Sequence, residues 1–441
     1  MISIKGKNEL YRIFCTFKDK LLSQSIPIVR IRYIDDKNFF CSGDHDFIIP
    51  PVKRESVLQT LFSVCVEREC SFLLDRKKTN KTRAIIYDHS SQNSLVLEFW
   101  TTLEVRNDSS IFPYIEWEKI QPHVFRNEAG YFLNIDFEAL YYLSHLLTKR
   151  KNISEESVKK RLLYYKNHKD LDASVRKLYE RLELLHDIET IGREANKIMI
   201  RQDILDRSCR ADAVKRKIHQ VFSRADEILF NKNRANRLIS ILGPDGVGKT
   251  SLIRGISEEI GSGVYTYRFK NYYRGAIIYR LLYPLIKMYV QNKNKTLYQR
   301  NQVEELYVYP IFLLSVLRYH LNIKRLFSRN IQITDRYFHD YILTGSRLNE
   351  DRIERHHKWE KMLKIIPRTL AIVQVDADNQ SIHSRRSEIS SEQIDGFRKE
   401  YFYLSMLSFS NFYVYLNNSC ELKDGIRTLQ YFLKRMKIFS Q

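Results

Sequence analysis

The stretch Ile241–Gly255, ILGPDGVGKTSLIRG, decides how this chain is interpreted. It follows an apolar β-type run, Arg237–Leu242, and leads into a helical pattern, Thr250–Ile260. A glycine-rich loop between a strand and a helix lets backbone N–H groups and the helix N-terminus converge on phosphate oxygens. Glycines permit left-handed backbone angles and a close approach to the ligand. The stretch therefore predicts a nucleotide-phosphate site in a parallel α/β domain.

The individual positions of this loop have expected roles. Lys249 is expected to neutralise the β- and γ-phosphates of ATP, and Thr250 to ligate Mg²⁺. Three of the 14 glycines of the chain lie between positions 243 and 248, which argues against an ordinary turn. The loop alone does not distinguish a kinase from an ATPase or a GTPase. The predicted nucleotide-binding residues are Gly243, Asp245, Gly246, Val247, Gly248, Lys249, Thr250 and Ser251.

A second predicted strand, Ile331–Thr334, delivers Asp335 and Arg336 at its carboxyl end. Ligands of open α/β sheets lie at the carboxyl ends of the strands. An aspartate at that place can hold Mg²⁺, and an arginine can clamp a phosphate and offset charge in a transition state. A strand end with a surface ion pair is the alternative interpretation.

Several stretches, found in this order, resemble the thymidylate kinase family over roughly residues 237–441. They are GPDGVGKT at 243–250, ITDRYFHD at 333–340, PRTLAIVQVD at 367–376, the pair Arg385-Arg386, and FRKEYFYL at 397–404. The resemblance implies phosphoryl transfer from Mg·ATP, with two lid arginines that close over the transferring group. The catalytic residues implied in this way are Lys249, Asp335, Arg336, Arg385 and Arg386.

The carboxylate within the loop, Asp245, is explained by the same resemblance. In the family the equivalent acid contacts the acceptor, so one loop would position both substrates. A side chain that caps its own turn is the alternative. The segment Tyr265–Gly275, YTYRFKNYYRG, stands where the family carries an R-E-P-G-G-T-like stretch, and it lacks the glutamate and the glycine pair. The predicted acceptor-binding residues are Asp245, Arg268, Phe269, Arg274 and Arg336.

This departure leaves the acceptor open between a nucleotide, a sugar and a glycan end. The pattern is similar to a divergent bacterial branch of the family, in which the kinase-like domain is fused to a nucleotidyltransferase-like one. Residues 1–145 alternate short β-rich and helical runs, and therefore predict an α+β domain.

One strand of this first block carries paired carboxylates. In CSGDHDFII, at 41–49, Asp44 and Asp46 alternate and so share one face. Glu98 is expected to join them from a neighbouring strand, which gives the carboxylates that a two-metal site requires. The arrangement resembles the D-x-D strand of nucleotidyltransferase-fold proteins, without their upstream Gly-Ser turn. A degenerate substrate-binding domain and a charge pair at a strand edge are the alternatives.

The remaining blocks complete the expected architecture. Residues 146–236 are rich in charge and poor in Gly and Pro, which predicts a helical connector with Ser154 as a helix N-cap. Residues 237–441 predict a parallel sheet with helices on both faces. The expected fold is thus an α/β phosphate-loop domain, preceded by an α+β nucleotidyltransferase-like domain and the connector.

Composition limits the partners and the compartment. The chain has 73 Lys and Arg against 52 Asp and Glu, a net charge of +21, which favours anionic partners. The six cysteines have no metal-binding spacing, and no apolar run is long enough to cross a bilayer. We therefore expect a cytoplasmic protein without a transmembrane segment, and the sequence leaves a homodimer open.

The leading functional hypothesis is a kinase that uses ATP and Mg²⁺ and acts on an acceptor with an anionic group. An NTP-driven switch that binds nucleic acid or a protein partner is the first alternative. It is not favoured, because a switch needs no second anion site such as Arg336 and the lid arginines provide. An authentic thymidylate kinase with an altered acceptor loop is the second alternative.

Overall fold

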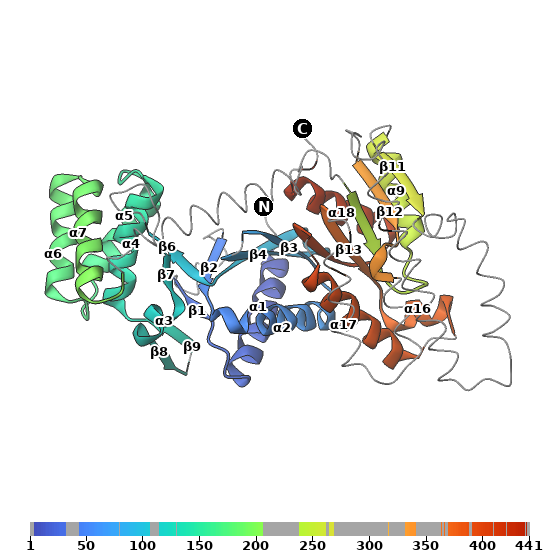
Figure 1. Ribbon diagram of the computed structural model, residues 1–441, viewed down its shortest axis with the longest axis horizontal. Coiled ribbons are helices and arrows are strands. Elements are labelled where there is room, and N and C mark those ends of the chain that lie inside the picture. The colour runs from blue at the N-terminus through green and yellow to red at the C-terminus, as the bar shows by residue number, and fades with distance from the viewer. Residues whose placement is uncertain are drawn as a thin grey trace. The chain divides into compact units, whose positions relative to one another are not determined.

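The structure is a computed structural model, and its described residues form two compact units (Figure 1). One unit comprises Met1–Cys65, Lys78–Ile85 and Asn93–Ala225, and the other comprises Val66–Lys77, Ile86–Gln92 and Asp226–Gln441. The division into three domains at residues 145 and 236 stays a prediction. The residues described are 4–31, 44–78, 80–105, 114–128, 130–205, 238–261, 264–268, 316, 331–340, 363, 366, 369–387, 390–408, 410–419, 421–436 and 438.

The second unit, here called the phosphate-loop unit, is built on a mainly parallel sheet with the strand order β11-β12-β10-β13-β14-β3. The first five strands run parallel, and β3 runs antiparallel to β14. All residues of β10, β13 and β14 are buried, as in strands covered on both faces. The bounds are β3 Ser71–Lys78, β10 Leu238–Leu242, β11 Val264–Arg268, β12 Ile331–Asp335, β13 Ala371–Asp376 and β14 Phe412–Asn417.

Helices lie on both faces of this sheet, and α18 and α17 lie on opposite sides of β13 in Figure 1. Helices α9 and α18 pack closely, because a side chain at Gly255 would overlap Ile426. On the other face, Gln374 of β13 donates through Nε2 to the carbonyl oxygen of Arg398 in α17, across 3.2 Å. The helices are α9 Lys249–Ile260, α16 Asn379–Arg385, α17 Ser391–Leu407 and α18 Leu422–Arg435. This part of the chain is therefore α/β, as the sequence predicts.

The first unit, here called the N-terminal unit, combines a mixed sheet with a group of packed helices. Its strands follow the order β4-β5-β2-β1-β9-β8, where the last residues of β4, from Ile86 on, belong to the other unit, and β6 and β7 form a separate antiparallel pair. The strands are β1 Val29–Arg30, β2 Asp44–Ile48, β4 Lys81–Asp88, β5 Asn93–Trp100, β6 Thr102–Glu104, β7 Tyr114–Glu116, β8 Val124–Asn127 and β9 Gly130–Leu133.

Helices α3 to α7 of this unit share one apolar core with β1, β6 and β9. That core extends from Val29 to Leu205, so the helices after residue 150 pack on the same cluster as the strands before it. The helical segments are α1 Ile4–Ser23, η2 Pro51–Lys53, α2 Arg54–Glu67, α3 Trp117–Ile120, η3 Gln121–His123, α4 Ile135–Lys149, α5 Glu156–Lys166, α6 Ala173–Leu185 and α7 Ile188–Arg201. None of the helices among the described residues has the length and apolarity needed to cross a membrane.

One local prediction is wrong. The N-cap of α5 is Glu155 rather than Ser154. Ser154 instead belongs to the preceding turn, where its backbone N–H and its hydroxyl both donate to Oδ1 of Asn152, at 3.0 and 2.7 Å. Ser154 is thus a donor to Asn152, whereas an N-cap serine accepts through its side-chain oxygen from a backbone N–H of the first helical turn.

Candidate functional site

The phosphate loop, residues 243–248, leaves the carboxyl end of β10 and enters α9. Its three glycines have positive φ angles, 139° at Gly243, 95° at Gly246 and 87° at Gly248. Space is restricted as well: a Cβ at Gly243 would overlap the carbonyl oxygen of Val375, and one at Gly248 would lie 2.8 Å from Nδ2 of Asn418. Both the backbone angles and the surroundings therefore require glycine at these two positions.

Lys249 begins α9 and is only 7% exposed. Its Nζ donates to the carbonyl oxygens of Gly243 and Pro244, at 2.8 and 2.6 Å. Burial, with repulsion from Arg336 as the next cause, lowers the pKa of Lys249 from 10.5 to about 8. The ammonium thus lies inside the curve of the loop, where phosphate oxygens could replace these carbonyls as acceptors.

Thr250 and Asp335 meet at the mouth of the loop. The register of β10 and β12 places Asp335 beside Ile241, immediately before the loop. From the first turn of α9, Oγ1 of Thr250 donates to Oδ2 of Asp335 across 3.2 Å. The other oxygen, Oδ1, is buried and has no hydrogen-bond partner among the described residues. A hydroxyl and a carboxylate with a spare oxygen fit Mg²⁺, which prefers oxygen ligands.

Arg336 links the strand end to the loop. It takes the left-handed angle φ 72°, and its backbone N–H donates to the carbonyl oxygen of Ile241 at 2.9 Å. Its guanidinium donates to Oδ1 of Asp245 and, at 3.5 Å, to Oδ1 of Asp340. The hydroxyl of Tyr401, in α17, donates to the same oxygen of Asp340. A non-glycine residue with this backbone angle costs energy, so several contacts are needed to hold it.

The carboxylates around Arg336 respond differently to their surroundings. Partial burial alone would raise the pKa of Asp245, but Arg336 and Lys249 outweigh it, so that this pKa is lowered. At Asp340 burial dominates and the pKa is raised, although Arg336 and Lys249 oppose the shift. Asp245 therefore stays ionised opposite Arg336, at the position where the sequence predicts the acceptor.

The predicted lid arginines lie beside the loop. Arg385, the last residue of α16, donates through NH1 to the carbonyl oxygen of Gly246 at 2.8 Å. Arg386 follows, and its Cγ would lie 3.3 Å from a Cβ at Gly246. The closing movement itself stays a prediction.

The predicted acceptor segment is only partly within the described residues. Arg268 is the last residue of β11 and pairs in register with Asp335, so its backbone belongs to the same sheet edge. Phe269 and Arg274 lie outside the described residues. Ser251 is exposed on the first turn of α9, next to Thr250, and Val247 is buried in the loop. The roles of all these residues in binding stay predictions.

Two contacts with the loop were not predicted from the sequence. Asn418 donates through Nδ2 to the carbonyl oxygen of Val247 at 2.9 Å, and the hydroxyl of Tyr401 lies 3.5 Å from the carbonyl oxygen of Gly243. Tyr401 stands in FRKEYFYL, and Asn418 follows β14. The signal that the sequence offered for each contact was the expected position of the residue near the carboxyl edge of the sheet.

The carboxylates of the predicted metal site in the N-terminal unit lie on neighbouring strands and make ion pairs. Asp46 and Glu98 are paired in register on β2 and β5, as expected for neighbouring strands. However, Glu98 makes ion pairs with Lys81 and Arg83, and Asp44 lies 2.6 Å from Arg83. Among the described residues no three His, Cys, Asp or Glu side chains gather as a metal ion would require. Asp44 and Glu98 are thus paired with cationic side chains, and metal binding by these carboxylates stays a prediction.

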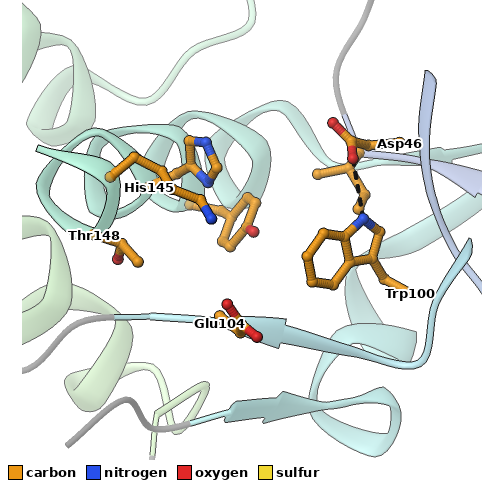
Figure 2. A pocket seen from close by; sticks show the side chains of 8 residues that line it. Asp46, Trp100, Glu104, His145 and Thr148 are labelled. Atoms are coloured by element: carbon orange, nitrogen blue, oxygen red, sulfur yellow. Dashed lines mark hydrogen bonds between the residues drawn. The ribbon is translucent and has the colours of Figure 1, made fainter. Parts of the chain in front are cut away.

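A pocket opens in the N-terminal unit between α4 and the strands (Figure 2). It measures about 300 Å³ with its open mouth included. Asp46 and Trp100 lie on one side of it, His145 and Thr148 on the other, and Glu104 lies on a third (Figure 2). The residues that line it are Ile31, Asp46, Trp100, Glu104, Tyr141, His145, Thr148 and Lys149.

Comparison with known proteins does not assign the chain to a family. No family model and no curated protein matches the chain. A thymidylate kinase from Ehrlichia chaffeensis is similar over 45% of this chain and 97% of its own, with 14% identity and a TM-score of 0.28. A deoxyadenosine kinase from M. mycoides, solved with dCMP and dCDP bound, is similar over 45% and 99%, with 12% identity and a TM-score of 0.29. Values this low carry no conclusion about the activity of the chain.

Proposed function

We propose that the chain is an ATP-dependent phosphotransferase that moves the γ-phosphoryl group of Mg·ATP to an acceptor with an anionic group. The observation that carries the proposal is the meeting of Thr250 and Asp335, at 3.2 Å, at the mouth of a glycine loop that encloses Lys249. A loop shaped for phosphates and an oxygen pair suited to Mg²⁺ are the two parts that binding of a nucleoside triphosphate requires.

The nucleotide half of the site is assigned to the loop and to α9. Backbone N–H groups at the start of α9 face the phosphates, and Lys249 exchanges its carbonyl acceptors for the β- and γ-phosphate oxygens. Thr250 and Asp335 would hold Mg²⁺, which would offset the negative charge of the phosphates when bound. Arg385 moves from the carbonyl oxygen of Gly246 to the transferring group.

The acceptor half is assigned to Asp245 and Arg336. Their contact beside the loop places one anionic and one cationic group side by side. Arg336 would bind the anionic group of the acceptor, and Asp245 would then accept a hydrogen bond from an acceptor hydroxyl. A switch has no use for this second charged pair, which favours the kinase. A nucleotide, a sugar and a glycan end remain the acceptor classes proposed.

The reaction needs little covalent chemistry from the protein. The acceptor oxygen attacks the γ-phosphorus, the bond between that phosphorus and the β,γ-bridging oxygen breaks, and ADP leaves with the bonding electrons. The proton of an attacking hydroxyl goes to solvent or to the phosphate. Lys249, Arg336 and the arginines at 385 and 386 position the groups and offset their negative charge.

The test is transfer of labelled γ-phosphate from Mg·ATP to a panel of thymidylate, other nucleoside monophosphates, sugars and glycan extracts. We expect label on one acceptor class, and loss of transfer in Lys249→Ala while the melting temperature stays that of a folded protein. Lys399→Ala is the matched control, because Lys399 is an exposed lysine on α17 whereas Lys249 is buried. Full transfer by Lys249→Ala would refute the assignment, and label released only as free phosphate would favour an NTP-driven switch.

A further inference from the structure

Two groups, each made of a tyrosine, an aspartate and an arginine, lie in the phosphate-loop unit. In the first group, the hydroxyl of Tyr415 donates to Oδ2 of Asp376 at 2.8 Å, and Nε of Arg398 donates to the same oxygen at 2.6 Å. The terminal nitrogens of Arg398 donate to Oδ1 of Asp395 and to the carbonyl oxygen of Ala377, both at 2.6 Å. Every nitrogen of this buried guanidinium thus has an acceptor within the unit, which makes the first group structural.

The second group consists of Tyr401, Asp340 and Arg336, and its arginine contacts the phosphate loop. Oδ1 of Asp340 accepts from the hydroxyl of Tyr401 and, at 3.5 Å, from one terminal nitrogen of Arg336. The other terminal nitrogen of Arg336 donates to Oδ1 of Asp245, and no further acceptor lies near this guanidinium among the described residues. A guanidinium carries five N–H hydrogens, and this side chain is 23% exposed. Donors therefore remain for an anionic ligand.

The two carboxylates that contact Arg336 differ in their freedom to move. The side chain of Asp245 is 50% exposed, whereas that of Asp340 is 7% exposed. A half-exposed carboxylate can turn towards solvent, which then replaces its partner. A buried carboxylate that leaves its donors loses hydrogen bonds that water does not replace. Asp340 is therefore the fixed support of the guanidinium, and Asp245 is the contact that an arriving ligand can displace.

The hydroxyl of Tyr401 completes this support from another element. Tyr401 is buried in α17, 61 residues after Asp340 in the chain. It has one hydroxyl hydrogen, and its contact with Asp340 is shorter than its contact with the carbonyl oxygen of Gly243. The hydrogen bond fixes the orientation of the carboxylate, and hence the position of the oxygen that Arg336 contacts. An arginine held in one rotamer before its ligand arrives loses less entropy on binding.

We propose that Tyr401 and Asp340 are positioning residues that hold Arg336 ready for the anionic group of the acceptor. This inference rests on the phosphoryl transfer proposed above, in which Arg336 binds that group. It adds two buried residues that act through Arg336 without touching the substrate. The support belongs to the acceptor half of the site, so its loss should weaken binding of the acceptor and leave binding of Mg·ATP unchanged.

The first experiment is steady-state transfer by the full chain from Mg·ATP to the acceptor that takes label in the panel above. Tyr401→Phe removes only the hydroxyl and should raise the KM for the acceptor by roughly 3- to 10-fold, the effect of one lost hydrogen bond. The KM for ATP should not change. In an Arg336→Lys background, where the two-pronged guanidinium is absent, Tyr401→Phe should have no further effect.

Tyr415→Phe is the matched control for this substitution. Tyr415 is also buried in the phosphate-loop unit, and its hydroxyl also donates to a carboxylate beside an arginine. This variant should leave both KM values unchanged. Circular dichroism and melting temperature check that all variants fold.

The second experiment needs no acceptor. Phenylglyoxal modifies arginine side chains, and mass spectrometry of the peptides gives the rate of modification at each arginine. Tyr401→Phe should release Arg336 and raise its rate by roughly threefold or more. The rate at Arg385, which contacts the carbonyl oxygen of Gly246, should stay that of the parent. Asp340→Asn weakens the same support from its other side, should also raise the rate at Arg336, and decides the question if Tyr401→Phe does not fold.

The outcomes separate this inference from the proposed function. Equal rates at Arg336 in the parent, Tyr401→Phe and Asp340→Asn would overturn the positioning role, whether or not transfer is seen. So would a Tyr401→Phe variant that raises the KM for ATP instead of the KM for the acceptor, or one whose effect is undiminished in Arg336→Lys. A parent that labels no acceptor, while both variants release Arg336, would refute the phosphoryl transfer and support the positioning of Arg336.

Discussion

The side-chain amide of Asn418 donates to the backbone carbonyl oxygen of Val247 across 2.9 Å. Asn418 follows β14 and is only 7% exposed, and its own backbone N–H donates to the carbonyl oxygen of Asp376 at 2.8 Å. The phosphate loop is therefore fastened to the end of a strand distant in sequence. Such a bond fixes the shape of the loop before any nucleotide arrives.

Replacement of Asn418 tests this fastening. Asn418→Ala should weaken binding of Mg·ATP by roughly 3- to 10-fold, since a net hydrogen bond contributes about 0.5–1.5 kcal/mol. Asn418→Asp should weaken it further, because a carboxylate would face the carbonyl oxygen of Val247. Calorimetric titration measures both. Asn152→Ala, at an exposed turn of the N-terminal unit, is the control, and equal affinities in all four proteins would contradict the prediction.

Nucleotide binding should depend on pH through Lys249. Before nucleotide binds, its pKa is about 8, below the ordinary 10.5, mainly because of burial. Phosphate stabilises the ammonium and raises this pKa, so binding should take up protons near pH 8, and the Kd should rise as pH increases above 8. Titration in buffers of different ionisation enthalpy measures the uptake. Lys249→Arg should abolish it, because arginine stays protonated at this pH.

The same shift has a consequence for stability. The unfolded lysine binds its proton up to pH 10.5, whereas the folded one releases it near pH 8. Between these values the unfolded state holds more protons, so the free energy of unfolding contributed by Lys249 should increase with pH. If nucleotide binding at pH 8 is accompanied by no proton uptake, Lys249 is already fully charged in the nucleotide-free protein, and both predictions for this residue are wrong.

Two glycines of the phosphate-loop unit should respond in opposite directions to alanine. Gly243→Ala introduces a Cβ that overlaps the carbonyl oxygen of Val375, at a φ of 139°. It should lower the free energy of unfolding by about 2 kcal/mol or more. A Cβ at Gly396, within α17, would meet no neighbouring group within 4 Å, so Gly396→Ala should raise it by about 0.5–1 kcal/mol. Urea denaturation measures the free energy of unfolding of both variants. An unchanged value for Gly243→Ala would refute the close approach of Gly243 to Val375.

His339 should make the phosphate-loop unit sensitive to acid. It is 1% exposed, and neither ring nitrogen has a hydrogen-bond partner among the described residues. Burial, followed by repulsion from Arg76, lowers the pKa of His339 to about 3. Because the unfolded histidine gains its proton near pH 6.5, stability is lost as pH falls from 6.5 towards 3.

A leucine at this position removes the titrating group. At pH 5 the unfolded histidine is protonated and the folded one is not, which costs about 2 kcal/mol. The gain in free energy of unfolding of His339→Leu over the parent protein should therefore be larger at pH 5 than at pH 7. Denaturation at both values measures the difference. An equal effect at the two values would show that the histidine is protonated, or solvated, in the folded protein.

The parts of the site that could be predicted are those marked by residues close together in the sequence. The glycine spacing and the two flanking patterns located the loop, and parallel pairing then brought Thr250 to Asp335. The contacts of Asn418 and Tyr401 with the loop escaped prediction because the two residues lie 171 and 158 residues from their partners. An asparagine or tyrosine on its own gives no sign of a distant backbone partner. The glycines and the lysine of the loop, by contrast, form a pattern that can be identified within a few residues.

The N-terminal carboxylates show a different limit. The alternation of Asp44 and Asp46 predicted a shared strand, and their strand does pair with that of Glu98. What the pattern could not give was the cross-strand partner: Arg83 and Lys81 lie opposite these acids and neutralise Glu98. The charges on one strand do not reveal the charges on the strand beside it, and those neighbouring charges distinguish a metal site from an ion-pair network.

The pairing of β3 with β14 has a consequence for synthesis of the chain. Ser71 and Asn417, which are joined by a hydrogen bond of 3.0 Å, lie 346 residues apart. At about 5–20 residues per second, a ribosome takes roughly 17–70 s to make the partner after the first strand has emerged. During that time the edge of β3 that pairs with β14 has no partner strand, and Phe72, Leu73 and Leu74, all buried in the finished unit, lie in that strand. We expect folding in the cell to need a chaperone that covers this segment until translation reaches residue 417.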